Sequence, residues 1–144
     1  MILYADTSAL VKRYILESGS LEIASVFEKA EFIGTSILTK IEMASAISKA
    51  VKMDWLHTDE AEKAWHSFQT EWPAFTRLTV SPPLIERAAR LALDHGLRGY
   101  DAAHLAASVS WQESLETPIT MATYDRELWE TSKKIGLSVW PEIL

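Results

Sequence analysis

The chain has 144 residues, 48% of them apolar and 24% charged, which is typical of a globular protein with a buried core and predicts a single domain over residues 1–144. It has no cysteine, which excludes disulfide bonds, thiolate metal sites and cysteine nucleophiles. The net charge of −6 is the opposite of the basic excess expected of a nucleic-acid-binding protein, unless basic residues are concentrated locally or cations neutralise a cluster of acids.

No segment indicates membrane insertion or export. The apolar runs are far shorter than the roughly 18 residues that a membrane helix needs. The first residues lack a charged n-region and a small-residue cleavage site, so we expect no signal peptide and a cytoplasmic location. Glycine and proline number five each, too few for a flexible linker.

Short apolar runs alternate with longer segments of helical period along the chain. The first half predicts a strand, two helices, a second strand and two further helices, at residues 2–5, 8–16, 21–30, 32–35, 36–53 and 58–71. The second half predicts strands and helices in alternation, at residues 75–80, 81–96, 100–115, 118–122, 126–135 and 137–140. Strands separated by helices cannot pair as tight hairpins, so the prediction is a three-layer α/β/α sandwich around a parallel sheet.

Two of these helices have distinctive faces. One carries a face of mostly small residues, expected to allow close packing: Ile41, Ala44, Ser45 and Ser48. Another carries an aromatic stripe: Trp65, Phe68 and Trp72. Core packing is the simplest interpretation of the stripe, and a protein interface is the alternative.

Four acidic residues occupy informative places in this pattern. Asp6 ends the first strand and Asp125 follows the fourth, so both are expected at the carboxyl edge of the sheet, where ligands bind in such folds. Asp101 opens an alanine-rich helix and could point toward the same edge, whereas Glu42 lies inside a helix. Taken singly, each aspartate also fits a helix cap or first-turn position, and Glu42 fits an exposed helical position.

Several carboxylates at one place would repel one another unless a cation neutralised them. Carboxylate and hydroxyl oxygens suit a hard divalent ion, Mg²⁺ or Mn²⁺. The chain lacks cysteine and clustered histidine, which argues against zinc.

Four segments carry a resemblance to a known family: "YADTSALVKRY", "TSILTKIEMASAI", "LRGYDAAHLAAS" and "TMATYDREL". In their order and spacing they resemble the PIN-domain family of metal-dependent ribonucleases, and among these the VapC toxins of VapBC toxin–antitoxin pairs. The resemblance extends over essentially the whole chain, and "YDAAHLA" and "ADTSALVK" are its more specific parts.

The resemblance implies a sheet of order 3-2-1-4-5 and a Mg²⁺- or Mn²⁺-dependent endoribonuclease. It implies an acidic, metal-binding cluster of Asp6, Glu42, Asp101 and Asp125. Ser8 and Thr123 would support the metal or a water molecule. It leaves open whether Glu42 is a ligand or positions water, and whether one or two metals bind. It further implies an RNA substrate, a VapB-like antitoxin partner and a homodimer.

Basic residues near the acids are candidates for RNA contact: Arg13, Lys40, Arg98 and Arg126. They would form a local rim that grips phosphate on an otherwise acidic protein. Ordinary solvated helix surface is the competing interpretation.

Three further alternatives bear on the site. His104 lies one turn after Asp101, as in an Asp-x-x-His metal pair, but a packed or hydrogen-bonded histidine is favoured because a di-iron site needs two such motifs. An aspartyl-phosphate phosphatase with Asp6 as nucleophile is disfavoured, because such enzymes place a second Asp where this chain has Ser8. An RNA-binding or RNA-processing module of the same fold, without a toxin role, is the other alternative.

Overall fold

A computed structural model describes residues 1–144 and contains one five-stranded parallel sheet. Its strands run in the order β3-β2-β1-β4-β5, which confirms the order that the resemblance implied. In chain order the strands are β1 (Ile2–Ala5), β2 (Phe32–Ser36), β3 (Thr76–Leu78), β4 (Thr120–Ala122) and β5 (Ser138–Trp140). Because β1 is central and its neighbours cover it on both sides, its residues from Leu3 to Ala5 are fully buried.

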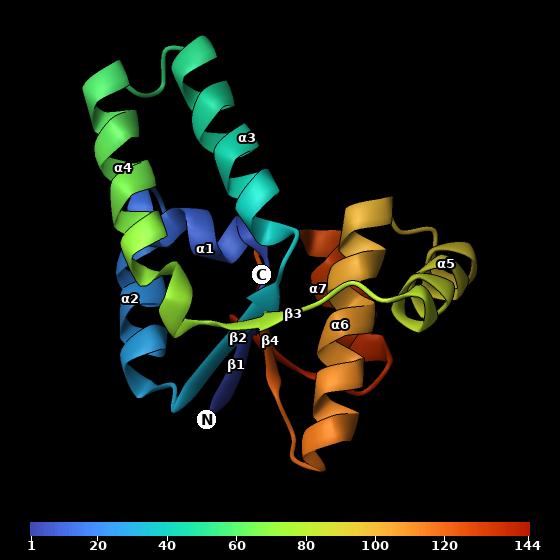
Figure 1. Cartoon of the computed structure of the whole chain (residues 1–144). Helices are drawn as coiled ribbons and strands as arrows, with labels where there is room; N and C mark the ends of the chain where they lie inside the picture. Colours follow the sequence, from blue (N-terminus) through green and yellow to red (C-terminus); the bar gives the residue numbers. More distant parts are fainter.

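Helices cover both faces of the sheet, as predicted (Figure 1). They are α1 (Thr7–Tyr14), α2 (Ser20–Lys29), α3 (Thr39–Lys52), α4 (Thr58–Glu71), the 3₁₀ turn η1 (Trp72–Ala74), α5 (Pro82–His95), α6 (Gly99–Leu115) and α7 (Arg126–Lys134). Helices α1 to α4 pack in one core with Leu3 and Ala5 of β1. Helices α5 to α7 pack in a second core with Tyr4, so successive residues of one strand serve opposite layers.

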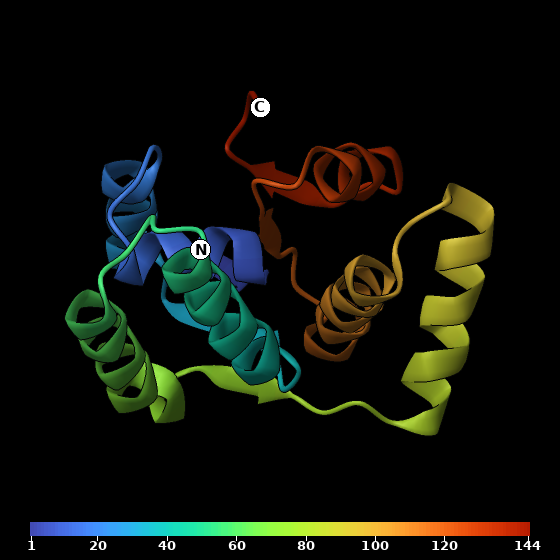
Figure 2. The ribbon, with the colours of Figure 1, turned by 90° about the horizontal axis from the view of Figure 1, so that it is seen from above.

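The outer helices are arranged differently on the two faces. On one face, α3 and α4 form an antiparallel pair that projects beyond the sheet (Figure 1). On the other, α6 lies between the sheet and α5, so α5 is the outermost helix (Figure 2). This position explains why α6 is buried over most of its length.

Two helix starts differ from the prediction. Helix α1 begins at Thr7 rather than Ser8, because the Asp6 side chain caps it by accepting from the Ala9 amide at 3.0 Å. Helix α3 begins at Thr39, because Ser36 completes β2 and its hydroxyl accepts from the Leu38 amide at 3.1 Å.

The predicted packing face of α3 is wrong. Its buried apolar residues are Met43, Ile47 and Ala50, which lie on a different face of the helix from the residues predicted to pack. Through this buried face, α3 packs against α1 and α4. The face predicted to pack is exposed to solvent: Ile41, Ala44, Ser45 and Ser48. Small side chains do not by themselves mark a contact face, because burial is driven by the larger apolar area of Met43 and Ile47.

The aromatic stripe of α4 and η1 is core, which confirms the simpler interpretation. Phe68 and Trp72 are buried, and Trp65 packs partly buried against the same cluster. Phe68 also meets Tyr14 of α1 edge-on, with ring centroids 5.5 Å apart.

No helix of the structure has the length and apolar character that would let it cross a membrane.

Candidate active site

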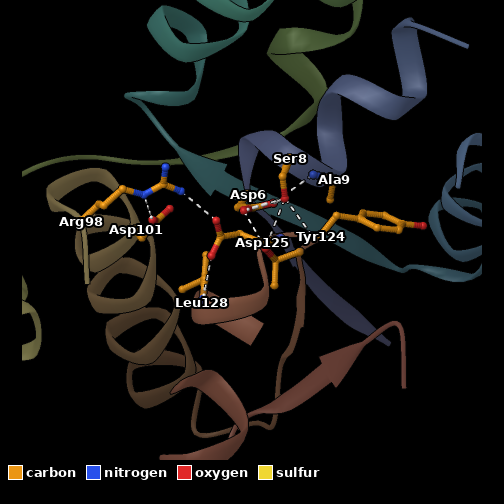
Figure 3. Close-up of polar contacts among 9 residues, drawn as sticks. Asp6, Ser8, Ala9, Arg98, Asp101, Tyr124, Asp125 and Leu128 are labelled. Atoms are coloured by element: carbon orange, nitrogen blue, oxygen red, sulfur yellow. Dashed lines mark hydrogen bonds and ion pairs between the residues drawn. The ribbon is translucent and has the colours of Figure 1, made fainter. Parts of the chain in front are cut away.

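Asp6 is held in a fixed orientation directly after the central strand. Its Oδ1 accepts from the Ser8 hydroxyl at 2.7 Å and from the Ala9 amide (Figure 3). Its Oδ2 accepts from the Thr123 hydroxyl at 2.7 Å. Burial raises the pKa of Asp6, although nearby His104 and these hydrogen bonds oppose that effect. The helix-cap and active-site interpretations are therefore both compatible with this residue.

Asp125 lies at the same sheet edge. The parallel register pairs Ala5 with Ala122, which places the ends of β1 and β4 side by side. The Thr123 hydroxyl, which donates to Asp6, also accepts from the Asp125 amide at 3.0 Å. Asp125 in turn caps α7 by accepting from the Leu128 amide at 2.9 Å.

Asp101 and Asp125 share one guanidinium group. Arg98 donates from Nε to Asp101 Oδ2 at 3.0 Å and from Nη2 to Asp125 Oδ2 at 2.8 Å (Figure 3). Burial and the neighbouring charge of Asp125 raise the pKa of Asp101, and the contact with Arg98 offsets this only in part.

Glu42 ends a buried hydrogen-bond chain. His104 Nε2 lies 2.6 Å from Glu42 Oε1, and His104 Nδ1 lies 2.8 Å from the Tyr4 hydroxyl. Burial raises the pKa of Glu42, but the His104 hydrogen bond and charge outweigh it, so the pKa lies below its ordinary value. Burial lowers the pKa of His104, but Glu42 outweighs this and the pKa is raised. The prediction that His104 is hydrogen-bonded is confirmed.

All four acids stand at the N-terminal ends of helices. Asp6 and Asp125 are the caps of α1 and α7, and Glu42 and Asp101 lie in the first turns of α3 and α6. The unpaired amides and the dipole at a helix N-terminus stabilise negative charge. This arrangement makes several neighbouring carboxylates tolerable in one place.

Asp125 is close enough to Asp101 to raise its pKa, but the acids do not form a closed chelate. No group of three Asp, Glu or His side chains is near enough to hold a metal ion as the side chains lie. Glu42 contacts His104 directly, and the charges of Asp6 and Asp101 also raise the pKa of that histidine. The donors are all carboxylate and hydroxyl oxygens, the set that Mg²⁺ and Mn²⁺ prefer, and a cation (Arg98) already sits between two of them.

The four basic candidates differ in their surroundings. Arg98 contacts the acids, whereas Lys40 and Arg126 are exposed without an ion pair. Arg13 is bound by Glu71 of α4 through two hydrogen bonds, at 2.7 and 2.9 Å. Its guanidinium is thus already paired with an acid outside the cluster.

Sequence reasoning missed Tyr4 and Thr7. Tyr4 is a fully buried residue of β1, and a buried hydroxyl requires a partner, but its partner lies 100 residues away. The Thr7 hydroxyl oxygen is buried without a hydrogen-bond partner, yet it contributes to the lowered pKa of Glu42. It therefore lies near that carboxylate.

The fold and site together define an α/β protein with an acidic cluster at the carboxyl edge of a parallel sheet. The chain belongs to the PIN-domain family, whose model matches residues 3–134. It is homologous to VapC ribonucleases, which confirms the family resemblance.

Two relatives illustrate this homology. Ribonuclease VapC45 of Mycobacterium tuberculosis is 29% identical over 143 residues, covering 97% of this chain and 95% of that protein. Ribonuclease VapC3 of Pyrobaculum aerophilum is 31% identical over 108 residues, covering 74% of this chain and 80% of that protein.

Solved structures show the same fold. PAE2754 of Pyrobaculum aerophilum matches with a TM-score of 0.66 at 23% identity, over 96% of this chain and 89% of that chain. A member of the VapBC family of toxin–antitoxin systems, VapBC-5 of Mycobacterium tuberculosis, matches with a TM-score of 0.61 at 17% identity, over 96% and 94% of the two chains.

Proposed function

We propose that this protein is a Mg²⁺- or Mn²⁺-dependent endoribonuclease, a single catalytic domain that acts as the toxin of a type II toxin–antitoxin pair. The observation that carries the proposal is the gathering of Asp6, Asp101 and Asp125 at one sheet edge in a PIN-domain chain, with Glu42 close by on His104. The homologous VapC proteins are named ribonucleases, which supports the activity.

The metal would be held by Asp6, Asp101 and Asp125, with Glu42 as a further ligand or as the group that positions water. When bound, such a cation lowers the pKa of a water molecule and stabilises negative charge on the phosphate. Ser8 and Thr123 hold the Asp6 carboxylate in place, as their hydrogen bonds to it indicate.

The remaining steps use residues of this chain. His104 contacts Oε1 of Glu42, and the second oxygen of that carboxylate would accept a hydrogen bond from the attacking water. The lowered pKa of Glu42 keeps it ionised, and an ionised carboxylate is an acceptor only. Water then attacks phosphorus in line, the 3′-oxygen leaves, and the products carry 5′-phosphate and 3′-hydroxyl ends.

The proposed partners are an RNA substrate, a VapB-like antitoxin and a second copy of the chain. Support for the antitoxin comes from structural relatives that are toxin–antitoxin complexes, such as one from Klebsiella pneumoniae. Co-expression with the product of a short reading frame directly upstream tests this pairing. Light scattering of the purified protein tests the homodimer.

The catalytic proposal is tested with Asp6→Asn, which keeps the shape and cap of the side chain but removes its charge. We expect cleavage of single-stranded RNA to fall by about 100-fold or more. The matched control is Asp54→Asn, an exposed loop residue with positive φ that asparagine tolerates, and it should retain full activity.

The chemistry of the product ends tests the mechanism separately. We expect 5′-phosphate and 3′-hydroxyl ends, and no cleavage in EDTA. A 2′,3′-cyclic phosphate product that forms equally well in EDTA would refute metal-assisted hydrolysis.

A further inference from the structure

Arg98 covers two of the acids from the solvent side. Its side chain is 74% exposed, whereas those of Asp101 and Asp125 are 12% and 22% exposed. One guanidinium bonds to both carboxylates and has no other ion pair. A cation that binds these two carboxylates therefore has to compete with the Arg98 guanidinium for their Oδ2 atoms.

Arg98 can bridge Asp101 and Asp125, and its ion pairs with them can also be broken by a competing cation. Asp101 and Asp125 are like charges that bind the two sides of one guanidinium, and a positive group between them relieves their mutual repulsion. Exposed ion pairs of this kind are weak, because water solvates both partners well. A divalent ion carries twice the charge of a guanidinium and displaces it readily from a pair of carboxylates.

We propose that Arg98 is a built-in counter-cation that competes with the divalent metal for Asp101 and Asp125, and that metal binding releases its guanidinium to bind an RNA phosphate. This inference rests on the metal site of the proposed function. Before the metal binds, Arg98 partly neutralises the acids. Afterwards, a freed guanidinium at the rim offers the planar donor pair that phosphate oxygens accept.

The release also addresses the charge problem of an acidic nuclease. RNA is repelled by exposed carboxylates, and an arginine paired with them attracts phosphate poorly. Once a metal neutralises Asp101 and Asp125, the same arginine contributes its full charge to phosphate binding. RNA affinity and metal occupancy are therefore coupled through one side chain.

Manganese binding to the RNA-free protein tests the competition directly. Electron paramagnetic resonance would give the Mn²⁺ affinity of the native protein, of Arg98→Ala and of Arg126→Ala. Arg126 is the matched control, because it is an exposed arginine next to Asp125 that makes no ion pair. We expect Arg98→Ala to bind Mn²⁺ about three- to tenfold more tightly, and Arg126→Ala to change the affinity less than about twofold.

The outcomes separate this inference from the proposed function. If the native protein and both variants bind Mn²⁺ equally well, the metal site stands and the competition by Arg98 is refuted. If none of them binds Mn²⁺, the metal site itself is refuted and the inference falls with it. Circular dichroism of each variant shows that the fold is intact, which is expected because both arginines are exposed.

RNA binding tests the release. The probe is a labelled single-stranded RNA of about ten nucleotides, measured by fluorescence anisotropy in EDTA and in Ca²⁺, which accepts the same oxygen ligands, with a gel to confirm that the RNA stays intact. We expect Arg98→Ala to weaken binding about threefold or more in Ca²⁺ and to change it less than about twofold in EDTA. An equal loss in both conditions would overturn the release of the guanidinium by metal.

Discussion

At the scale of single residues, two of the four acids of the proposed site also have a structural role. Asp6 and Asp125 cap helices and also belong to the acidic cluster. A capping carboxylate accepts hydrogen bonds from backbone amides. These bonds fix its position before any substrate or cation binds. Capping therefore does not exclude the proposed metal-binding role, because a cap fixes where the carboxylate lies.

The hydrogen-bond chain from Tyr4 to Glu42 predicts a stability effect. Tyr4→Phe keeps the ring but leaves the buried Nδ1 of His104 without a partner. We expect the free energy of unfolding to fall by about 1–3 kcal/mol in urea denaturation. The control is Tyr100→Phe, whose hydroxyl is exposed and makes no hydrogen bond, and it should have no effect. Equal losses in the two variants would contradict a structural role for the chain.

The hydrogen bonds of the Glu71 carboxylate predict a pH dependence of the free energy of unfolding. Arg13 and Tyr14 donate to its carboxylate, and the Arg13 hydrogen bond is the main reason that the pKa of Glu71 lies below its ordinary value of 4.5. A lowered pKa in the folded state contributes stability above the unfolded pKa and loses it as pH falls through the folded pKa.

Glu71→Gln should therefore be less stable than the native protein at about pH 7, and this difference should shrink toward about pH 3. The effect is modest, under about 1 kcal/mol, because the side chain is 38% exposed. Urea denaturation at the two pH values measures it. A difference that stays constant between them would show that the ionised carboxylate is not the cause.

At the scale of elements, the four acids of the proposed site lie where helices begin beside the carboxyl ends of the strands. Each parallel strand ends at the same edge, and the N-termini of α1, α3, α6 and α7 supply the positions of the four acids. The positive ends of these helices lower the electrostatic cost of gathering negative charge. The fold therefore favours an anionic cluster, and a bound cation, at this edge.

The close packing of α6 on the sheet predicts that a larger residue at Gly34 destabilises the fold. A Cβ added to Gly34 in β2 would clash with Cζ3 and Cη2 of Trp111, which α6 contributes to the core. We expect Gly34→Ala to lower the free energy of unfolding by about 1–3 kcal/mol, because a buried indole has little room to move.

Thermal denaturation measures the effect of Gly34→Ala, and Gly99→Ala is its matched control. No atom lies within 4 Å of a Cβ at Gly99, the first residue of α6. Alanine should be neutral there, or stabilising by up to about 1 kcal/mol, because it limits the unfolded chain. If Gly34→Ala behaved like this control, the sheet and α6 would pack less tightly than the structure shows.

At the scale of the whole molecule, a net charge of −6 has to be reconciled with the polyanionic RNA substrate that we propose. The exposed Lys40 and Arg126 stand beside the acids without ion pairs and are free to bind phosphate. Removing one phosphate-binding cation should reduce the slope of log affinity against log salt concentration by about 0.7 for a single strand.

We therefore expect Lys40→Ala and Arg126→Ala each to weaken RNA binding and to flatten its salt dependence by about that amount. Lys134→Ala is the control, because Lys134 is exposed at the opposite end of α7 from Asp125. Anisotropy titrations at several salt concentrations provide the measurement. The same slope for all three variants would mean that charge acts globally rather than through a local rim.

Much of this molecule was determined by local sequence. The alternation of apolar strands with helical periods was sufficient to predict the parallel sheet, and the place of Asp6 and Asp125 after strands was sufficient to predict their common edge. These features follow from short-range periodicity and from the fact that parallel strands end on the same side. The strand order itself needed the family resemblance.

Only the tertiary structure decided which side chains meet. Tyr4 and His104 are 100 residues apart, Glu42 and His104 are 62 apart, and Arg98 and Asp125 are 27 apart. The contact face of α3 was likewise mispredicted from its small residues. Such contacts depend on how whole elements pack against one another, which no local pattern encodes. The acids of the proposed site can thus be found in the sequence, whereas the contacts that Arg98 and His104 make with them are visible only in the folded chain.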